Sequence, residues 1–505
     1  MPLSESIEKP MIAESPIAVF SNTYARLPER FFARLCPTPV AKPHLIKFNE
    51  TLASELGIHT EALEPDELAA VFAGNVIPQG AEPIAMAYAA HQFGNFVPQL
   101  GDGRAILLGE VLDRNGERRD IQLKGSGPTP FSRRGDGRAA LGPVLREYLV
   151  SEAMHALGIP TTRALAAVLT GERVFRERPL RGAVLTRVAS SHIRIGTFQY
   201  FAARGDIEAV ERLSGYVIDR HFPGARDSES PPLALLHTVV ERQALLVARW
   251  MHVGFIHGVM NTDNTGLSGE TIDFGPCAFL DSYDPAKSFS AIDELGRYAY
   301  GNQPKIAQWN LARFAETLLP LLDPDADRAI ELANEAISVF TPRFQECWLA
   351  GMRNKLGLSS SEDGDLDLAN TLLRAMHEGG ADFTLTFRRL CDAAAHEKAD
   401  ANVRILFANP AAYDGWAATW RSRLAAETLE SSARAQMMRT TNPAFIPRNH
   451  RVERALNAAI EYGDFSPFAE MLTVLSRPYE DQPAFADYAN APQPDERVFR
   501  TFCGT

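Results

Sequence analysis

The stretch "HGVMNTDNTGLSGETIDFG", residues 257–275, constrains the fold of this chain more than any other. It is a polar loop that directly follows "PPLALLHTVVERQALLVARWMHVGFIHG", which predicts a long apolar helix. Strand and turn patterns dominate from about residue 86 to 204, where "RAILLGEVLDRNGERRDIQLKGSG" predicts two strands joined by a turn at Asn115-Gly116. From about residue 205 the pattern is mainly helical. The chain is therefore predicted to be α+β, with the polar loop next to the junction of its two parts.

The loop fits most of a pattern that protein kinases use for phosphoryl transfer. That pattern is H-[RG]-D-x-x-x-x-N followed by D-F-G, in which the Asn and the last Asp hold metal ions. His257, Asn264 and Asp273 occupy the corresponding positions, but Val259 stands where the catalytic Asp belongs. The order of strands, loop and helices predicts a two-lobed, protein-kinase-like fold with a strand-rich N-lobe and a helical C-lobe.

Four regions are predicted from these patterns. Residues 1–85 form an N-terminal extension, and 86–204 form the nucleotide-binding N-lobe. Residues 205–345 form the C-lobe with the catalytic loop and D-F-G, and 346–505 form a helical C-terminal region that ends in a Cys-containing tail. A short strand is expected to begin in "IDFGPCAFLD", and residues 286–440 are expected to be helical.

A lysine and a glutamate complete the predicted phosphate site. Lys124 lies in the strand "DIQLKG", and Glu147 lies 23 residues later on the predicted helix "LGPVLREYLVSEAMHALGIPTT". A glutamate in that place can pair with the lysine and orient it, and Glu152 is a weaker candidate. Such residues are usually on the surface, so the pair is predicted only in combination with Asn264 and Asp273.

Asp263 is the candidate that replaces the missing base at Val259. Its carboxylate lies beside Asn264 and can accept a hydroxyl proton if the reacting phosphorus takes a different position. The alternative is that Asp263 only hydrogen-bonds its own loop, since Asp is a common turn residue.

Arginines are concentrated in the predicted N-lobe. Residues 101–200 hold 15 Arg and one Lys against 10 Asp and Glu, a balance of 16 − 10 = +6, whereas the whole chain carries −12. Genome composition is an alternative explanation for the use of Arg rather than Lys across the chain. It does not explain why cations exceed acidic residues between residues 101 and 200. Arg suits planar contacts to phosphate. The turns Gly101-Asp102-Gly103-Arg104 and Arg133-Arg134-Gly135-Asp136-Gly137-Arg138, with Arg187 and Arg194 after them, therefore predict a cation-lined phosphate pocket.

Composition excludes several other classes of protein. A net charge of −12 argues against general nucleic-acid binding. No apolar run is long enough for a membrane span, and no signal or transit peptide is recognised, so a cytoplasmic protein without membrane contact is expected. The five cysteines lack the spacing of a zinc site or of a secreted disulfide framework.

These motifs resemble selenoprotein O, the SelO family of pseudokinases, called YdiU in bacteria. The resemblance runs over residues 20–505 through "YAAHQFGNFVPQLGDGRA", "IQLKGSGPTPFSRRGDGRAALGPVLREYLVSEAMHALGIPTTRAL", "TRVASSHIRIGTFQ", "WMHVGFIHGVMNTDNTGLSGETIDFGPCAFLD" and "NPAFIPRNHRVERAL".

The resemblance implies a protein adenylyltransferase that binds ATP in a flipped orientation. AMP would pass to Ser, Thr or Tyr hydroxyls of other proteins, with release of pyrophosphate and a link to redox homeostasis. Asp263 would accept the proton, and Asn264 and Asp273 would bind Mg²⁺ or Mn²⁺. The implied ATP-binding residues are Gly101, Gly103, Arg104, Lys124, Asp136, Gly137, Arg187 and Arg194. The resemblance also implies a disulfide between Cys277 and Cys503, with two free thiols as the alternative.

Three other functions remain open at this point. The chain can be a kinase that uses Asp263 as a displaced base, a transferase of UMP with Mn²⁺, or an inactive nucleotide-sensing scaffold.

Overall fold

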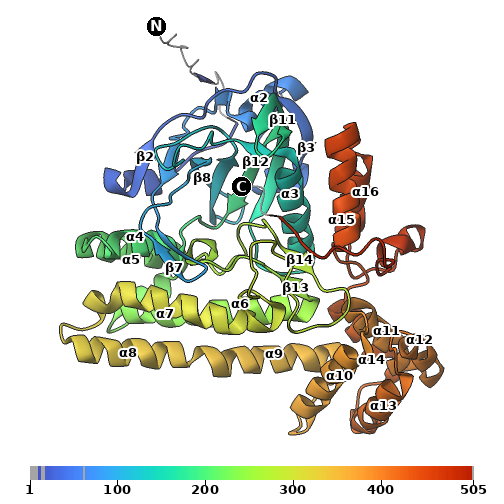
Figure 1. Cartoon of the computed structure of the whole chain (residues 1–505). Helices are drawn as coiled ribbons and strands as arrows, with labels where there is room; N and C mark the ends of the chain where they lie inside the picture. Colours follow the sequence, from blue (N-terminus) through green and yellow to red (C-terminus); the bar gives the residue numbers. More distant parts are fainter. Residues whose placement is uncertain (1–9, 13–16, 61–62, 503–505) are drawn as a thin grey trace.

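The strand-rich and helical parts of the chain lie one above the other in the computed structural model (Figure 1). The structure describes residues 10–12, 17–60 and 63–502. Strands are concentrated before about residue 190 and long helices after it, as the sequence predicts. The mixed α/β class with this division is confirmed.

An antiparallel sheet of eight strands forms the N-terminal part, with seven strands in the order β2-β5-β8-β9-β12-β11-β3 and β10 paired to β12. The strands are β2 (Phe32–Arg34), β3 (His44–Phe48), β5 (Ile84–Met86), β8 (Ala105–Leu112), β9 (Arg118–Lys124), β10 (Ala139–Ala140), β11 (Arg163–Phe175) and β12 (Pro179–Ala189). Strands from both sides of residue 85 therefore share one sheet. Three further pairs are β1 (Met11–Ile12) with β4 (Val76–Ile77), β6 (Ala90–Gln92) with β7 (Asn95–Val97), and β13 (Phe255–Ile256) with β14 (Ala278–Phe279).

Helices cover the sheet and build the rest of the molecule. In the N-terminal part they are α1 (Glu50–Glu55), α2 (Pro65–Ala73) and α3 (Leu141–Ala156). Those that follow are α4 (Ile195–Ala202), α5 (Ile207–His221), α6 (Pro231–Val253), α7 (Gln303–Leu322), α8 (Ala326–Ser338), α9 (Phe340–Leu356), α10 (Asp365–Gly379), α11 (Phe383–Ala395), α12 (Asp400–Arg404), α13 (Pro410–Ala425), α14 (Ser431–Thr441), α15 (Asn449–Asn457) and α16 (Ser466–Leu475).

Most of the predicted local elements are confirmed. The Asn115-Gly116 turn joins β8 to β9, α3 ends before Gly158, and α6 ends at Gly254 with φ 74°. The expected strand at "IDFGPCAFLD" is wrong in its position, because Ile272 to Cys277 are not in a strand and only Ala278–Phe279 pair with β13. Residues 286–299 are turns and irregular segments rather than helix, since Asp293 and nearby backbone groups hydrogen-bond locally, and Tyr300–Asn302 form a short 3-10 helix before α7.

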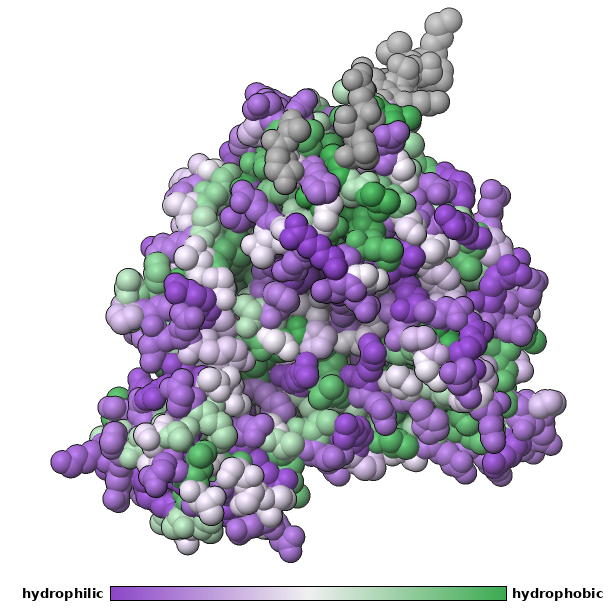
Figure 2. Space-filling model, turned by 180° about the vertical axis from the view of Figure 1, so that it is seen from behind, coloured by the Kyte–Doolittle hydropathy of each residue, from purple (hydrophilic) through white to green (hydrophobic). Residues whose placement is uncertain are grey.

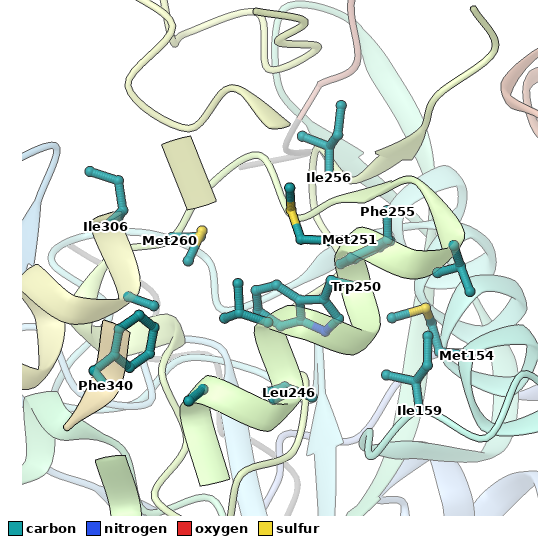
Figure 3. Close-up of a cluster of buried hydrophobic side chains, with 14 of the residues drawn as sticks. Met154, Ile159, Leu246, Trp250, Met251, Phe255, Ile256, Met260, Ile306 and Phe340 are labelled. Atoms are coloured by element: carbon teal, nitrogen blue, oxygen red, sulfur yellow. The ribbon is translucent and has the colours of Figure 1, made fainter. Parts of the chain in front are cut away.

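A buried apolar cluster supports the polar loop from below (Figure 3). Trp250 at the end of α6 packs with Leu246, Met251, Phe255 and Met260, all of them buried. Its indole Nε1 donates to Thr271 Oγ1 at 2.9 Å, so the buried ring packs against apolar side chains while its N–H group is hydrogen-bonded. This contact holds the Thr271 end of the polar loop against α6.

The C-terminal helix α15 is fastened to the segment after D-F-G. Asn449 Oδ1 accepts from Phe279 N at 3.0 Å, and Asn449 Nδ2 donates to Phe279 O at 2.7 Å, so one side chain replaces a neighbouring strand for β14. Arg448 is 1% exposed and makes two hydrogen bonds with Asp382, at 2.7 and 3.0 Å. A further bond of 3.1 Å joins it to Asp281.

The rest of the surface is mostly polar. Hydrophilic side chains cover most of the face shown in Figure 2, with hydrophobic ones scattered among them. Within the described ranges, no helix combines the length and hydrophobicity that crossing a bilayer requires.

We expect Arg448→Ala to lower the free energy of unfolding by about 3–5 kcal/mol, because it leaves the Asp382 carboxylate buried without its cation. Thermal and urea unfolding midpoints measure the loss. The matched control is Arg477→Ala, which removes an exposed ion pair with Glu480 and should cost less than about 1 kcal/mol. Equal losses in the two variants would contradict this assignment.

Candidate active site

Sheet register places two of the predicted phosphate ligands side by side. In the pairing of β9 with β12, Lys124 lies opposite Leu185 and Gln122 lies opposite Arg187. Residues opposite one another point to the same face, as do residues two apart. Lys124 and Arg187 therefore project together toward α3.

Glu147 on α3 binds both of these cations. Its Oε2 accepts from Lys124 Nζ at 2.6 Å, and its Oε1 accepts from Arg187 Nε. The predicted Lys124–Glu147 pair is thus present, whereas Glu152 binds Arg163 and Asn49 instead. Burial opposes the charge on Glu147, but Arg187 and Lys124 outweigh it and lower the pKa of its carboxyl.

The Asp273 carboxylate lies among three cations. It pairs with Arg187, with Lys124 Nζ at 3.5 Å, and with Arg194 Nη1 at 3.3 Å. Despite the opposing effect of burial, these cations hold the pKa of Asp273 well below its usual range. Its φ of 66° is left-handed, a strained conformation for a non-glycine residue that the ion pairs help to maintain.

Asp263 lies next to this cluster and has a different electrostatic environment. Its side chain is 9% exposed, and its Oδ1 is buried without a hydrogen-bond partner in the described part of the chain. Burial raises the pKa of Asp263 to about 6, against the lowering effect of Arg194 and of a hydrogen bond from Gln92. A carboxylate with a raised pKa and an uncommitted oxygen is suited to receive a proton.

The polar loop is held in place by buried hydrogen bonds. Burial lowers the pKa of His257, which donates from Nε2 to Ile272 O at 2.9 Å. Asn264 Nδ2 donates to Val259 O at 2.8 Å, which leaves its oxygen available to a ligand. His257 therefore holds the loop together through a backbone hydrogen bond.

Asn264 and Asp273 are suitable donors for Mg²⁺ or Mn²⁺. Both line the same cleft and offer the amide and carboxylate oxygens that these ions prefer, usually together with substrate phosphates. Across the residues that the structure describes, no group of three or more His, Cys, Asp or Glu has the geometry of a metal site. The residues fit an ion that is shared with phosphate oxygens better than a closed protein site.

Two glycines, Gly101 and Gly137, form part of the cleft lining. At Gly101, with φ 74°, a Cβ atom would lie 2.3 Å from the Phe131 ring. At Gly137, with φ 64°, it would lie 2.0 Å from the carbonyl oxygen of Gly127. Neither position has room for a side chain, so the backbone itself faces the cleft.

One cleft of about 520 Å³ brings the predicted residues together. Its lining includes Gly101, Gly103, Arg104, Lys124, Asp136, Gly137, Arg187, Arg194, Asp263, Asn264 and Asp273. Glu147 lies behind Lys124 rather than in the lining. Their proximity is observed, whereas their roles in binding and catalysis stay predictions.

Sequence patterns missed several residues of this cleft. Tyr88 stacks against the Arg194 guanidinium, whose central carbon lies 4.5 Å from the centre of the Tyr88 ring. Arg176 forms two hydrogen bonds with the Asp136 carboxylate, at 2.9 and 3.0 Å, and these are the main reason why the pKa of Asp136 is lowered. Asp102 is buried in the lining. Asp102 stood inside the recognised Gly-Asp-Gly-Arg turn, but no spacing signal pointed to Arg176.

The predicted cysteine pair is described at one end only. Cys277 is 2% exposed and contacts Phe274 O at 3.7 Å. Cys503 lies outside the described residues, so the disulfide stays a prediction. Thr501, close to it in sequence, donates to Pro276 O at 2.6 Å.

Comparison with known proteins identifies the family. A family model described as "Protein adenylyltransferase SelO" matches residues 17–476. The chain belongs to the SelO family. The chain is similar to curated proteins named "Protein nucleotidyltransferase YdiU". The one from Rhizobium rhizogenes is 63% identical over 503 residues, which cover 100% of both chains. The one from Rhizobium etli is 65% identical over 486 residues, which cover 96% of this chain and 97% of the relative. A third, from Rhizobium meliloti, is 64% identical over 486 residues, 96% of this chain and 99% of the relative.

We expect Lys124→Ala and Arg187→Ala each to weaken binding of an ATP analogue by about 1.5–3 kcal/mol, because each removes a charge-assisted contact in a buried site. Isothermal titration calorimetry with Mg²⁺ measures the loss. Arg178→Ala removes an exposed cation on the β11–β12 turn and serves as the control. Unchanged affinity in the first two variants would contradict the phosphate role.

Proposed function

We propose that this chain is a protein adenylyltransferase with a protein-kinase-like fold. The SelO family description and the names of the relatives support nucleotidyl transfer to proteins. The finer choice of AMP depends on how the cleft would hold a triphosphate. The proposal extends to the redox link implied by the family resemblance, which would act through the choice of protein substrates.

The observation that carries the proposal is the group of three cations around Asp273. Lys124, Arg187 and Arg194 are 10% exposed or less in their side chains, so they form a positive floor deep in the cleft. The most highly charged part of ATP, its β- and γ-phosphates, gains most from such a floor. With that end at the floor, the α-phosphorus lies nearer the mouth of the cleft and can meet an incoming hydroxyl.

The proposed transfer has a balanced course. The hydroxyl oxygen of the protein substrate forms a bond to the α-phosphorus, while its proton passes to the Asp263 carboxylate. The bond between the α-phosphorus and the α,β-bridging oxygen breaks, and pyrophosphate leaves with that electron pair. Asp263 is suited to this role by its free Oδ1 and its raised pKa.

Asn264 and Asp273 would hold a divalent ion, since both line the cleft and offer oxygen ligands. When bound, Mg²⁺ or Mn²⁺ would neutralise charge on the phosphate oxygens. Lys124, Arg187 and Arg194 would then exchange part of their contact with Asp273 for contact with phosphate. Glu147 would keep Lys124 and Arg187 in place during this exchange, since it binds both.

Labelled nucleotides test the proposal. ATP labelled at the α-phosphorus should label protein substrates or the enzyme itself, and ATP labelled at the γ-phosphorus should not. Asp263→Asn keeps the size of the side chain and should reduce labelling at least about a hundredfold, as expected for loss of a general base, while ATP-analogue binding remains. Asp219→Asn on α5, an exposed site, is the control.

The alternatives give different results in the same assay. Transfer of the γ-label would indicate a kinase. Preferential transfer from UTP with Mn²⁺ would indicate uridylylation. If an Asp273→Ala variant keeps every activity of the unaltered chain, the result would indicate an inactive nucleotide-sensing scaffold.

A further inference from the structure

Two segments of the chain form a partly apolar rim at the mouth of the cleft. We call five residues of these segments the acceptor rim. They are Phe93 and Phe96 on one segment, and Ile292, Leu295 and Arg297 on the other. Phe93 and Ile292 also line the cleft itself. We propose that the acceptor rim binds an extended segment of the protein substrate, one with an apolar and an acidic side chain close to the acceptor hydroxyl. This rests on the proposed function.

Both segments of the rim are fixed to one side chain of the polar loop. Asn261 Oδ1 accepts from Phe93 N at 3.0 Å and from Tyr298 OH at 2.6 Å. The Phe93 and Tyr298 rings also pack with centres 5.1 Å apart. Because Asn261 is two residues before Asp263, a peptide held by the rim has a defined position relative to the predicted proton acceptor.

The first segment is held by its neighbours in a strained form. Phe93 has φ 51°, which is uncommon for a bulky residue and is a feature of functional sites in particular. His91 N donates to Thr262 Oγ1 at 2.7 Å, and the Gln92 side chain bonds Asp263. The turn between β6 and β7 is thus built against the polar loop, next to α4 and α7 in Figure 1.

The second segment presents its apolar side chains to solvent. Leu295 is 97% exposed and Ile292 61%, while Phe96 on the opposite segment is 40% exposed. The turn that carries Leu295 is closed by two hydrogen bonds, because the Asp293 carboxylate accepts from Arg297 N at 2.9 Å and from Tyr298 N at 2.8 Å. A fully exposed leucine on a hydrogen-bonded turn, three residues after the exposed Ile292, is typical of a contact surface.

Charge determines which peptide suits the rim. The Arg297 guanidinium lies between Gly94 and the Trp309 ring, 4.9 Å from the ring centre, and its buried Nε has no hydrogen-bond partner in the described ranges. Inside the cleft, seven cationic side chains face four carboxylates. The cations are Arg104, Lys124, Arg133, Arg138, Arg176, Arg187 and Arg194, and the carboxylates are Asp102, Asp136, Asp263 and Asp273. The excess of cations in the cleft lining favours an acidic residue over a basic one, and such a residue would meet Arg297, with the exposed Glu294 on the same turn as the one opposing charge of the segment 292–297 outside Asp293.

A binding experiment tests the rim separately from group transfer. A fluorescent peptide with one tyrosine flanked by leucine and glutamate is titrated with the full-length chain, a non-hydrolysable ATP analogue and Mg²⁺. A second peptide carries serine and lysine at the flanking positions. Fluorescence anisotropy should show tighter binding of the first peptide.

Variants of the rim sharpen the test. Leu295→Asp should weaken binding of the first peptide about tenfold, as expected for loss of one large apolar contact. Arg297→Gln should reduce the preference for glutamate over lysine. Ile405→Asp, a change at a 74% exposed residue after α12, is the matched control and should bind normally. Binding of the ATP analogue should be unchanged in all three variants, which shows that the cleft is intact.

The outcomes separate the rim from the proposed function. Equal binding of the two peptides, or normal peptide binding by Leu295→Asp, would overturn the rim even if α-labelled ATP is transferred. Selective, Leu295-dependent binding would support it even if the transferred label proves to be the γ-phosphate. Sedimentation velocity tests whether a second copy of the chain binds this surface instead of a peptide. If Leu295→Asp abolishes a dimer but leaves peptide binding normal, the surface is a dimer interface.

Discussion

The attraction between the Asp273 carboxylate and three buried cations holds the candidate site together. Lys124 and Arg187 come from the sheet, Arg194 precedes α4, and Asp273 ends the polar loop. Three separate parts of the chain therefore converge on one negative charge. Removing several ions from water is costly unless their charges and hydrogen bonds are matched, and Glu147 supplies the second negative charge that the cations require.

This arrangement also explains why two aspartates ten residues apart behave differently. Asp273 is surrounded by cations and stays ionised, whereas Asp263 is more deeply buried and has Arg194 as its main counter-charge. The pKa values of the two carboxyls are moved in opposite directions. Environments that separate the pKa values of neighbouring groups in this way are common in active sites.

Local sequence patterns predicted which residues meet at the cleft better than they predicted the long-range contacts that support it. Lys124, Glu147, Asn264 and Asp273 could be predicted because their spacing follows the order of strand, helix and loop. The sharing of Glu147 between Lys124 and Arg187 depends on the register of β9 with β12, which no single segment specifies. The contact of Asn449 with Phe279 joins residues 170 positions apart. Such pairings result from tertiary packing, so hydrophobic periodicity and turn residues could not indicate them.

Asn449 gives β14 its outer neighbour, and this has a consequence for the order of assembly. During synthesis the sheet, α3 and the polar loop all emerge before residue 449, yet the strand after D-F-G still exposes an unsatisfied backbone edge. That edge can be closed only after Asn449 has left the ribosome. A nascent chain would thus contain every polar group that lines the cleft well before the segment beside it is secured, so the cleft can mature only after α15 has been synthesised.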